Sequence, residues 1–178
     1  MTYAQPRLSA GSIRQFYLAP PSRATLTHYL QLQADLPFTY AAVGATQSTP
    51  PSGYTLDHNQ LQLGTGEAIY RQACVALQQW EMFNLGWVRL CWPTTPLITG
   101  ATVGVIAQVL GLYILNACRL VYTVNEEKAD GARFGFAYGT LPGHIERGEE
   151  RFLIEWRPDD TVWYDILAFS QPNHWLGR

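Results

Sequence analysis

The side chains best suited to chemistry gather in one stretch, from Arg133 to Arg151, which reads RFGFAYGTLPGHIERGEER. His144, Glu146 and Glu149 lie close together in it. An imidazole titrates near neutral pH, so a neighbouring carboxylate could orient His144 as a general base or as a ligand contact. The competing interpretation is a solvated turn whose charges pair with one another and contribute little to stability. His144, Glu146 and Glu149 are therefore the candidate catalytic residues.

Candidate contacts to a bound molecule extend beyond this loop. Asp165 stands in an apolar run, where a carboxylate is costly unless it is bonded. We expect Asp165 either to face solvent or to pair with an arginine, for which the candidates are Arg89, Arg119 and Arg151. Glu67 is explained more simply as a carboxylate in the first turn of a helix, where the helix dipole favours it. The set of candidate ligand contacts is Tyr138, His144, Glu149, Arg151, Asp165 and Glu67.

Several common kinds of site lack support in the sequence. The glycines of the 133–151 stretch match neither the dinucleotide-binding nor the P-loop pattern, so nucleotide binding has little support. No order of Ser, His and Asp and no metal-ligand spacing stands out, and the sequence names no cofactor. The three cysteines are widely spaced, which argues against a disulfide framework or a zinc site and fits small buried side chains in a reducing cytoplasm: Cys74, Cys91 and Cys118.

The composition is that of a single globular domain with few charges. The chain has 178 residues, of which 47% are hydrophobic and only 15% charged, against a norm of about 25% charged. Extensive internal apolar surface, a partner-binding face, or both would account for this. The net charge of −2 gives no strong electrostatic reason to expect nucleic acid or an anionic membrane as a partner.

One apolar segment, 97–117, must be tested as a membrane span. It is about twenty residues long and uncharged, which is the length of a spanning helix. However, Gln108 and Asn116 interrupt it, and its β-branched residues favour strands. We therefore predict two buried strands joined near Gly111 and no transmembrane segment. The N-terminus also lacks the apolar core of a secretory signal.

The remaining patterns predict an arm over 1–21 followed by one α+β domain over 22–178. Ser22 is a candidate N-cap for a helix over 22–33, and a continuous apolar stripe predicts a longer helix over about 66–82. Alternation predicts a strand over 54–64, with a small hairpin around 57–59 as an alternative. Short connections between the later strands permit an antiparallel meander and leave no room for crossover helices. These strands are expected at 86–92, 102–109, 112–125, 133–140, 151–157 and 161–170.

Five segments carry a resemblance to a known family. They are 40–46 (YAAVGAT), 64–67 (GTGE), 80–87 (WEMFNLGW), 133–152 and 162–170 (VWYDILAFS). Over about 25–175 the chain resembles the uncharacterised family called domain of unknown function nineteen-ninety. That family has no established biochemistry, so this resemblance implies no activity.

The order of elements has a looser similarity to the helix-grip fold of the START and polyketide-cyclase superfamily. That resemblance implies a curved, mainly antiparallel sheet of about six or seven strands wrapped around one long helix and an apolar cavity. Members mostly bind hydrophobic ligands, and some catalyse cyclisation or similar reactions. They usually continue into a C-terminal helix that closes the cavity, whereas this chain ends at Arg178. Either that helix is missing or another chain supplies the lid.

These observations lead us to expect a binding protein. A hydrophobic small molecule would occupy an apolar groove between the sheet and the helix at 66–82. One alternative is an enzyme that uses His144 with Glu146 or Glu149 at the mouth of that groove. Another is an interaction protein that self-associates, or joins a larger complex, through the open face and the N-terminal arm.

Overall fold

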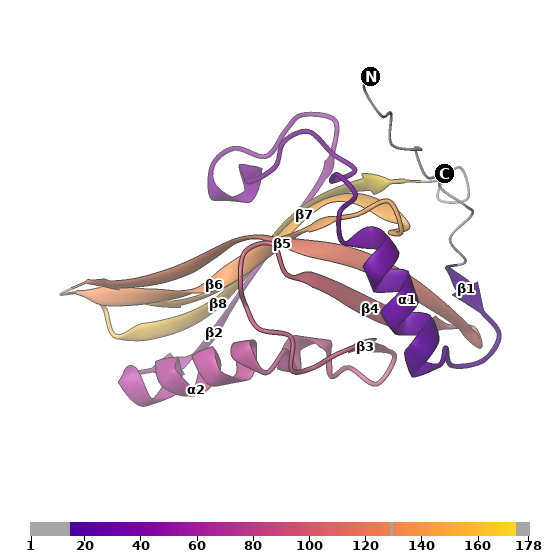
Figure 1. Ribbon diagram of the computed structural model, residues 1–178. Helices are drawn as coiled ribbons and strands as arrows, with labels where there is room; N and C mark the ends of the chain where they lie inside the picture. The colour runs from indigo at the N-terminus through magenta and orange to yellow at the C-terminus, as the bar shows by residue number, and fades with distance from the viewer. Residues whose placement is uncertain (1–14, 129, 174–178) are drawn as a thin grey trace, which may run out of the picture.

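The computed structural model describes residues 15–128 and 130–173. It is mostly sheet, with 47% of the residues in strands and 18% in helices. Two α-helices and two short 3-10 turns accompany eight strands in this part of the chain. In chain order (Figure 1) the elements are β1 (Phe16–Tyr17), α1 (Arg23–Gln33), η1 (Ala45–Gln47), β2 (Thr55–Thr65), α2 (Glu67–Gln78), η2 (Glu81–Phe83), β3 (Val88–Leu90), β4 (Thr102–Val109), β5 (Leu112–Lys128), β6 (Gly131–Thr140), β7 (Glu146–Trp156) and β8 (Thr161–Pro172).

All the described strands belong to one curled antiparallel sheet. Its order is β2-β8-β7-β6-β5-β4-β3, and β1 pairs with the start of β5. The five strands from β4 to β8 follow one another as a meander, because their connections are too short for crossovers. Apart from β1, the described strand that departs from sequence order is β2: it pairs with the last strand, Thr55 opposite Ser170, and forms one edge of the sheet.

Both faces of this sheet are covered. Side chains alternate along a strand, so Val105 joins the cluster beneath α2 while its neighbour Ile106 joins the cluster beneath α1. Figure 1 shows α2 on one side of the sheet and the segment between α1 and β2 on the other. This double burial explains why β4 and β5 read as nearly continuous apolar runs.

The two helices follow from local signals. Ser22 caps α1 by accepting the amide of Thr25 at 3.2 Å, as its N-cap position predicts. Glu67 lies in the first turn of α2 and pairs with Arg71 one turn later, which confirms its role as a helix-start carboxylate. The α2 helix ends at Gln78 because Trp80 adopts a positive φ of 60°. It is therefore shorter than the predicted helix over 66–82.

The predicted fold class, a sheet wrapped around one long helix, is wrong. The α2 helix has only 12 residues and rests on one face of the sheet. Aromatic side chains fill the space next to it, with the ring of Trp80 4.8 Å from that of Phe136 and the ring of Phe83 6.1 Å from that of Phe152. A packed aromatic core thus replaces the apolar cavity of a helix-grip fold, and the looser START-like resemblance is not supported.

The uncharged segment over 97–117 forms β4 and β5, joined at Leu110 and Gly111 as predicted. No helix in the described residues has the length and hydropathy needed to span a membrane. The strand β7 begins at Glu146, five residues earlier than the predicted 151, so most of the expected charged loop belongs to the sheet. The first fourteen residues of the predicted arm and the end of the chain after 173 lie outside the described residues.

Candidate functional site

A cleft of about 340 Å³ opens where β6, β7 and β8 meet the loop over 141–145. We call it the acidic cleft, because four carboxylate-bearing residues line it, and three of them are not bonded on the opposite face of the sheet as Glu149 is: Asp57, Glu146 and Glu150. Strand alternation places Glu150 on the same face as Phe152, which packs against η2 in the α2 core. The remaining lining residues are Tyr138, Thr140, His144, Gly148, Glu149, Ala168, Phe169 and Ser170.

Glu150 stands at the boundary between this cleft and the core. It lies directly opposite Tyr138 in the sheet, and the phenol donates to its Oε2 at 2.5 Å. The Tyr138 ring packs in turn against Phe152, with centroids 5.5 Å apart, and against Phe83. The aromatic core therefore holds Tyr138, and Tyr138 holds the Glu150 carboxylate.

The environment of the acidic cleft disfavours negative charge. Burial raises the pKa of Glu150; the Tyr138 hydrogen bond lowers it, and the nearby carboxylates of Glu146 and Asp57 raise it further. Burial also raises the pKa of Glu146. No lysine or arginine is among the described residues that line the cleft. The cleft thus concentrates carboxylates without a compensating cation.

His144 is bonded to the backbone of Glu146. Its Nδ1 lies 2.9 Å from the Glu146 amide nitrogen and 3.1 Å from the Glu146 carbonyl oxygen, so it accepts from the amide in one tautomer and donates to the carbonyl in the other. Burial lowers the pKa of His144 to about 4, and the imidazole is therefore uncharged at neutral pH. Backbone bonds fix the loop, since the His144 amide donates to Leu141 and its carbonyl accepts from Asn173.

Glu149 borders the cleft, but its carboxylate makes its hydrogen bonds on the opposite face of the sheet. The side chain is only 2% exposed. It accepts from the hydroxyl of Tyr40 at 2.7 Å and from the amides of Gly44 and Thr46 at 2.6 and 3.0 Å. The Thr46 hydroxyl donates to it at 2.5 Å. With its acceptor sites filled, Glu149 anchors the segment between α1 and β2 to the sheet.

A glycine makes this anchor possible. Gly139 lies opposite Glu149 in the sheet, and a Cβ at Gly139 would come within 2.0 Å of the Tyr40 hydroxyl oxygen. Only a residue without a side chain lets Tyr40 reach the carboxylate. The glycines of the 133–151 stretch thus include one with a packing role, in agreement with the absence of a phosphate-loop pattern.

Arg151 and Asp165 form a second buried network on that same face. Arg151 donates to Asp165 Oδ1 at 2.6 Å, which confirms the predicted pairing with an arginine. His58 and Gln60 bond Asp165 Oδ2 at 2.8 and 2.6 Å. Burial raises the pKa of Asp165, but these three partners more than offset it, and the net shift of the pKa is downward. Arg151 also donates to the carbonyl of Thr46, so both networks hold the same segment.

The structure separates the sequence-predicted residues into groups. Tyr138, His144 and Glu146 line the acidic cleft, and Glu149 borders it. Arg151 and Asp165 lie on the other face, and Glu67 lies at the exposed start of α2, outside the residues that line the cleft. No group of three or more His, Cys, Asp or Glu residues in the described chain is placed to hold a metal ion.

Sequence reasoning missed Glu150 and Asp57. Alternation could have identified Glu150, because it shares a face with the apolar Phe152 and Ile154 if the strand begins early enough. Asp57 had no such signal. It reaches the cleft only because β2 pairs with β8, where Asp57 lies opposite Ala168, a contact distant in sequence.

Comparison with known proteins identifies the family but no activity. A UPF0548 protein from Dictyostelium discoideum is 35% identical over 92% of this chain and 84% of its own length. A UPF0548 protein from Deinococcus radiodurans is 34% identical over 88% of this chain and 82% of its own length. A crystal structure of a hypothetical protein from Helicobacter pylori covers 76% of this chain and 79% of that one, with 9% identity and a TM-score of 0.46. That likeness is too weak to carry an argument.

The family model described as domain of unknown function (DUF1990) matches residues 39–178, which include the whole acidic cleft and both buried networks. The resemblance expected from the sequence motifs is thereby confirmed, and the chain belongs to the DUF1990 family.

Proposed function

We propose that the protein binds a small, positively charged organic molecule in the acidic cleft. The observation that carries this proposal is the placement of Asp57, Glu146 and Glu150 around one cleft that no described lysine or arginine lines. A cation would relieve the repulsion that raises the pKa of Glu150. Bound between carboxylates in a partly desolvated site, it would gain more than it would from a fully solvated surface pair.

The shape and the neutral groups of the cleft support a small organic ligand. Its volume of about 340 Å³ falls at the lower end of typical ligand pockets, which start at about 300 Å³. Tyr138 provides aromatic surface beside the carboxylates, and aromatic faces attract cations. His144 adds an uncharged imidazole. This combination suits a ligand with an ammonium group and a short apolar or hydroxylated body.

The expected hydrophobic ligand has less support than this cation. The described apolar groove beside α2 has a volume of about 180 Å³, below the usual range for ligand pockets. Its walls are formed by Leu63, Ala73, Ala76, Leu77, Glu81, Met82, Ile154 and Tyr164. We therefore propose a binding function with the acidic cleft, and not the apolar groove, as the ligand site. A cytoplasmic location also stays a prediction.

Calorimetric titration with small amines tests the proposal. The probes are ethanolamine, choline and putrescine, each compared with a neutral molecule of similar size, such as ethylene glycol for ethanolamine. We expect the amines to bind and the neutral molecules not to bind. Glu150→Gln should weaken amine binding at least about tenfold, the loss of one buried charge-assisted contact. The matched control is Glu127→Gln, an exposed glutamate at the far end of β5. Equal binding by both variants would contradict the proposal.

A second candidate function is proton transfer on the bound molecule. The specific observation that favours it is the presence of opposite pKa perturbations in one cleft, upward for Glu150 and downward for His144. In this case Glu150 is the acid or base and His144 an uncharged hydrogen-bonding group, so the predicted general-base role passes to a different residue. The test is recovery of the bound amine after incubation. A ligand altered by the wild type but not by Glu150→Gln identifies an enzyme, and a ligand recovered intact from both identifies a binding protein.

A further inference from the structure

The hairpin that joins β4 and β5 ends in an exposed, strained leucine. Leu110 has 99% of its surface exposed and a φ of 49°, and Gly111 follows with a φ of 80°. Val109 pairs with Leu112, so the turn has two residues, both in the left-handed region. Asn or Gly is the favoured residue at such a position, and a leucine there is uncommon. Neither packing nor backbone geometry accounts for Leu110.

Other exposed apolar side chains surround this tip. Val109 and Leu112 flank the turn, and both are exposed. Leu18, which is 82% exposed, follows the β1 residues that pair with β5 beside the turn. Trp87 is 55% exposed, and its carbonyl accepts from the Gln108 amide. We call these five residues the hairpin patch: Leu18, Trp87, Val109, Leu110 and Leu112.

The side chains of the hairpin patch project from both faces of the sheet at this end. The side chain of Trp87 projects with its neighbour Gln108 to one face, whereas Val109, the next residue, projects to the other. A flat protein surface would contact only one face of the sheet or the tip. A deformable apolar medium that surrounds the tip contacts all five side chains.

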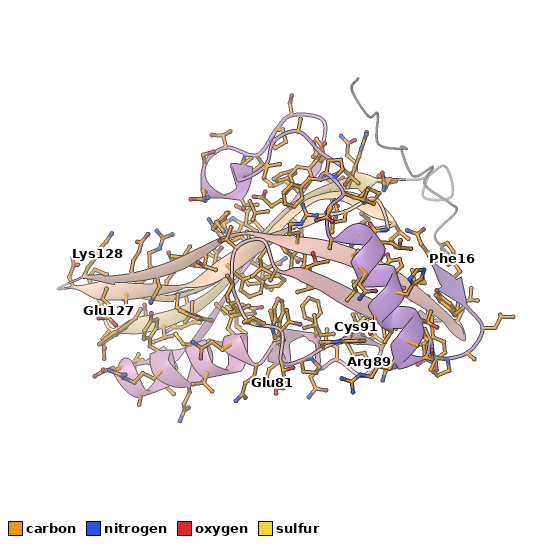
Figure 2. All side chains as sticks on the ribbon, viewed as in Figure 1. Phe16, Glu81, Arg89, Cys91, Glu127 and Lys128 are labelled. Carbon is orange, nitrogen blue, oxygen red and sulfur yellow. The ribbon has the colours of Figure 1, made fainter. Side chains whose placement is uncertain are left out.

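The acidic residues are unevenly distributed along the chain, although the net charge is only −2. Of the 14 aspartates and glutamates, none lies in the segments 15–34 and 82–125, which include β1, α1, β3, β4 and most of β5. Those segments carry three arginines: Arg23, whose guanidinium lies over the Trp92 ring, Arg89, and Arg119, which donates to the carbonyls of Gln33, Ala34 and Leu36. Figure 2 shows Arg89 toward this end and Glu127 at the opposite end of the sheet. One carboxylate lies near Arg89: Glu81 and Arg89 line the same groove beside η2.

We propose that the hairpin patch docks the protein on a lipid bilayer with anionic headgroups. Leu110 and its apolar neighbours enter the hydrocarbon boundary, and Trp87 lies at the interface that tryptophan favours. Arg23 and Arg89 face the headgroups, where each arginine contributes through attraction to the surface charge. The attachment proposed here is peripheral and reversible, because a few side chains at one tip enter the boundary of the bilayer.

Vesicle co-sedimentation of the full chain tests this inference. The vesicles are pure phosphatidylcholine or an equal mixture of phosphatidylcholine and phosphatidylglycerol. We expect binding to the anionic mixture, weakened by salt, and much less binding to the neutral vesicles. Leu110→Asn should weaken it at least about tenfold, the expected loss for one buried leucine. Arg89→Gln should weaken it about fivefold on anionic vesicles only.

The design separates loss of binding from loss of folding. Asn suits the left-handed turn position, so Leu110→Asn should keep or raise the melting temperature. The matched control is Leu61→Asn, an exposed leucine of the edge strand β2, which should leave vesicle binding unchanged. Three results would each overturn the proposal: no sedimentation of the wild type with anionic vesicles, equal sedimentation of Leu110→Asn, or a dimer in light scattering that Leu110→Asn dissociates while neither protein binds vesicles.

Discussion

At the scale of single residues, the two neighbouring glutamates of β7 have opposite roles. Glu149 is fully bonded and holds a segment of the chain in place, whereas Glu150 is bonded by Tyr138 and repelled by other carboxylates. A residue that costs stability and borders a cleft is typical of a functional position, because function and stability are selected separately. This contrast is the main reason for assigning ligand contact to Glu150 and a structural role to Glu149.

Replacement of Glu149 should therefore be a folding defect. In Glu149→Gln, one carboxylate oxygen becomes an NH₂ group that faces donors on Tyr40, Gly44 or Thr46. Unpaired buried donors and the lost charge-assisted bonds should lower the free energy of unfolding by about 3 kcal/mol. Urea denaturation measures this loss, and proteolysis should cut the segment over 38–53 first. A change within about 0.5 kcal/mol, the usual range for surface substitutions, would contradict the structural role.

His144 should make the fold sensitive to acid. Its pKa in the folded state is about 4, below the roughly 6.5 of an unfolded histidine, so the unfolded chain binds the proton more readily. The stabilising contribution of the neutral ring is complete above pH 6.5 and is lost as the pH falls toward 4. His144→Gln should flatten the stability profile between these pH values relative to the wild type. Parallel profiles in denaturant titrations would show that His144 is not buried as described.

At the scale of elements, the β4–β5 hairpin provides a prediction about its turn. Leu110→Asn places a residue with a favourable left-handed conformation before Gly111 and removes an exposed apolar side chain. We expect the free energy of unfolding to rise by about 0.5 kcal/mol, since strain at one turn residue is relieved. Thermal denaturation measures it. A destabilised variant would mean that Leu110 makes a contact that stabilises the hairpin.

The elements also show what the sequence could predict. The Ser22 cap fixed the start of α1, and β-branched residues correctly predicted two strands over 97–117. The length of α2 was overestimated because the apolar stripe continues to Trp80, while the backbone turns at that residue. Local patterns also gave no indication that β2 would pair with β8, and this pairing brings Asp57 to the cleft. Contacts between distant segments were therefore the part that sequence patterns could not provide.

At the scale of the whole molecule, the two proposed sites lie on separate parts of the sheet. The acidic cleft involves β6, β7 and β8, and the hairpin patch lies at the start of β5. A membrane-docked protein could thus keep the cleft open to ligand. Self-association stays a prediction, and α2 and the aromatic core cover the face of the sheet that was expected to be open. Light scattering of the full chain at micromolar concentration tests it, and a clean species of 20.0 kDa would contradict it.

The most direct test of the central claim is the titration of the Glu150 carboxyl carbon by NMR, with and without a saturating amine. In the free protein, we expect its pKa to lie above the usual value for glutamate, because burial and the neighbouring carboxylates disfavour the charge. Bound amine should lower that pKa, and by linkage the amine should bind more weakly as the pH falls through it. A normal pKa in the free protein, or one that the amine leaves unchanged, would contradict the assignment of the acidic cleft as a cation-binding site.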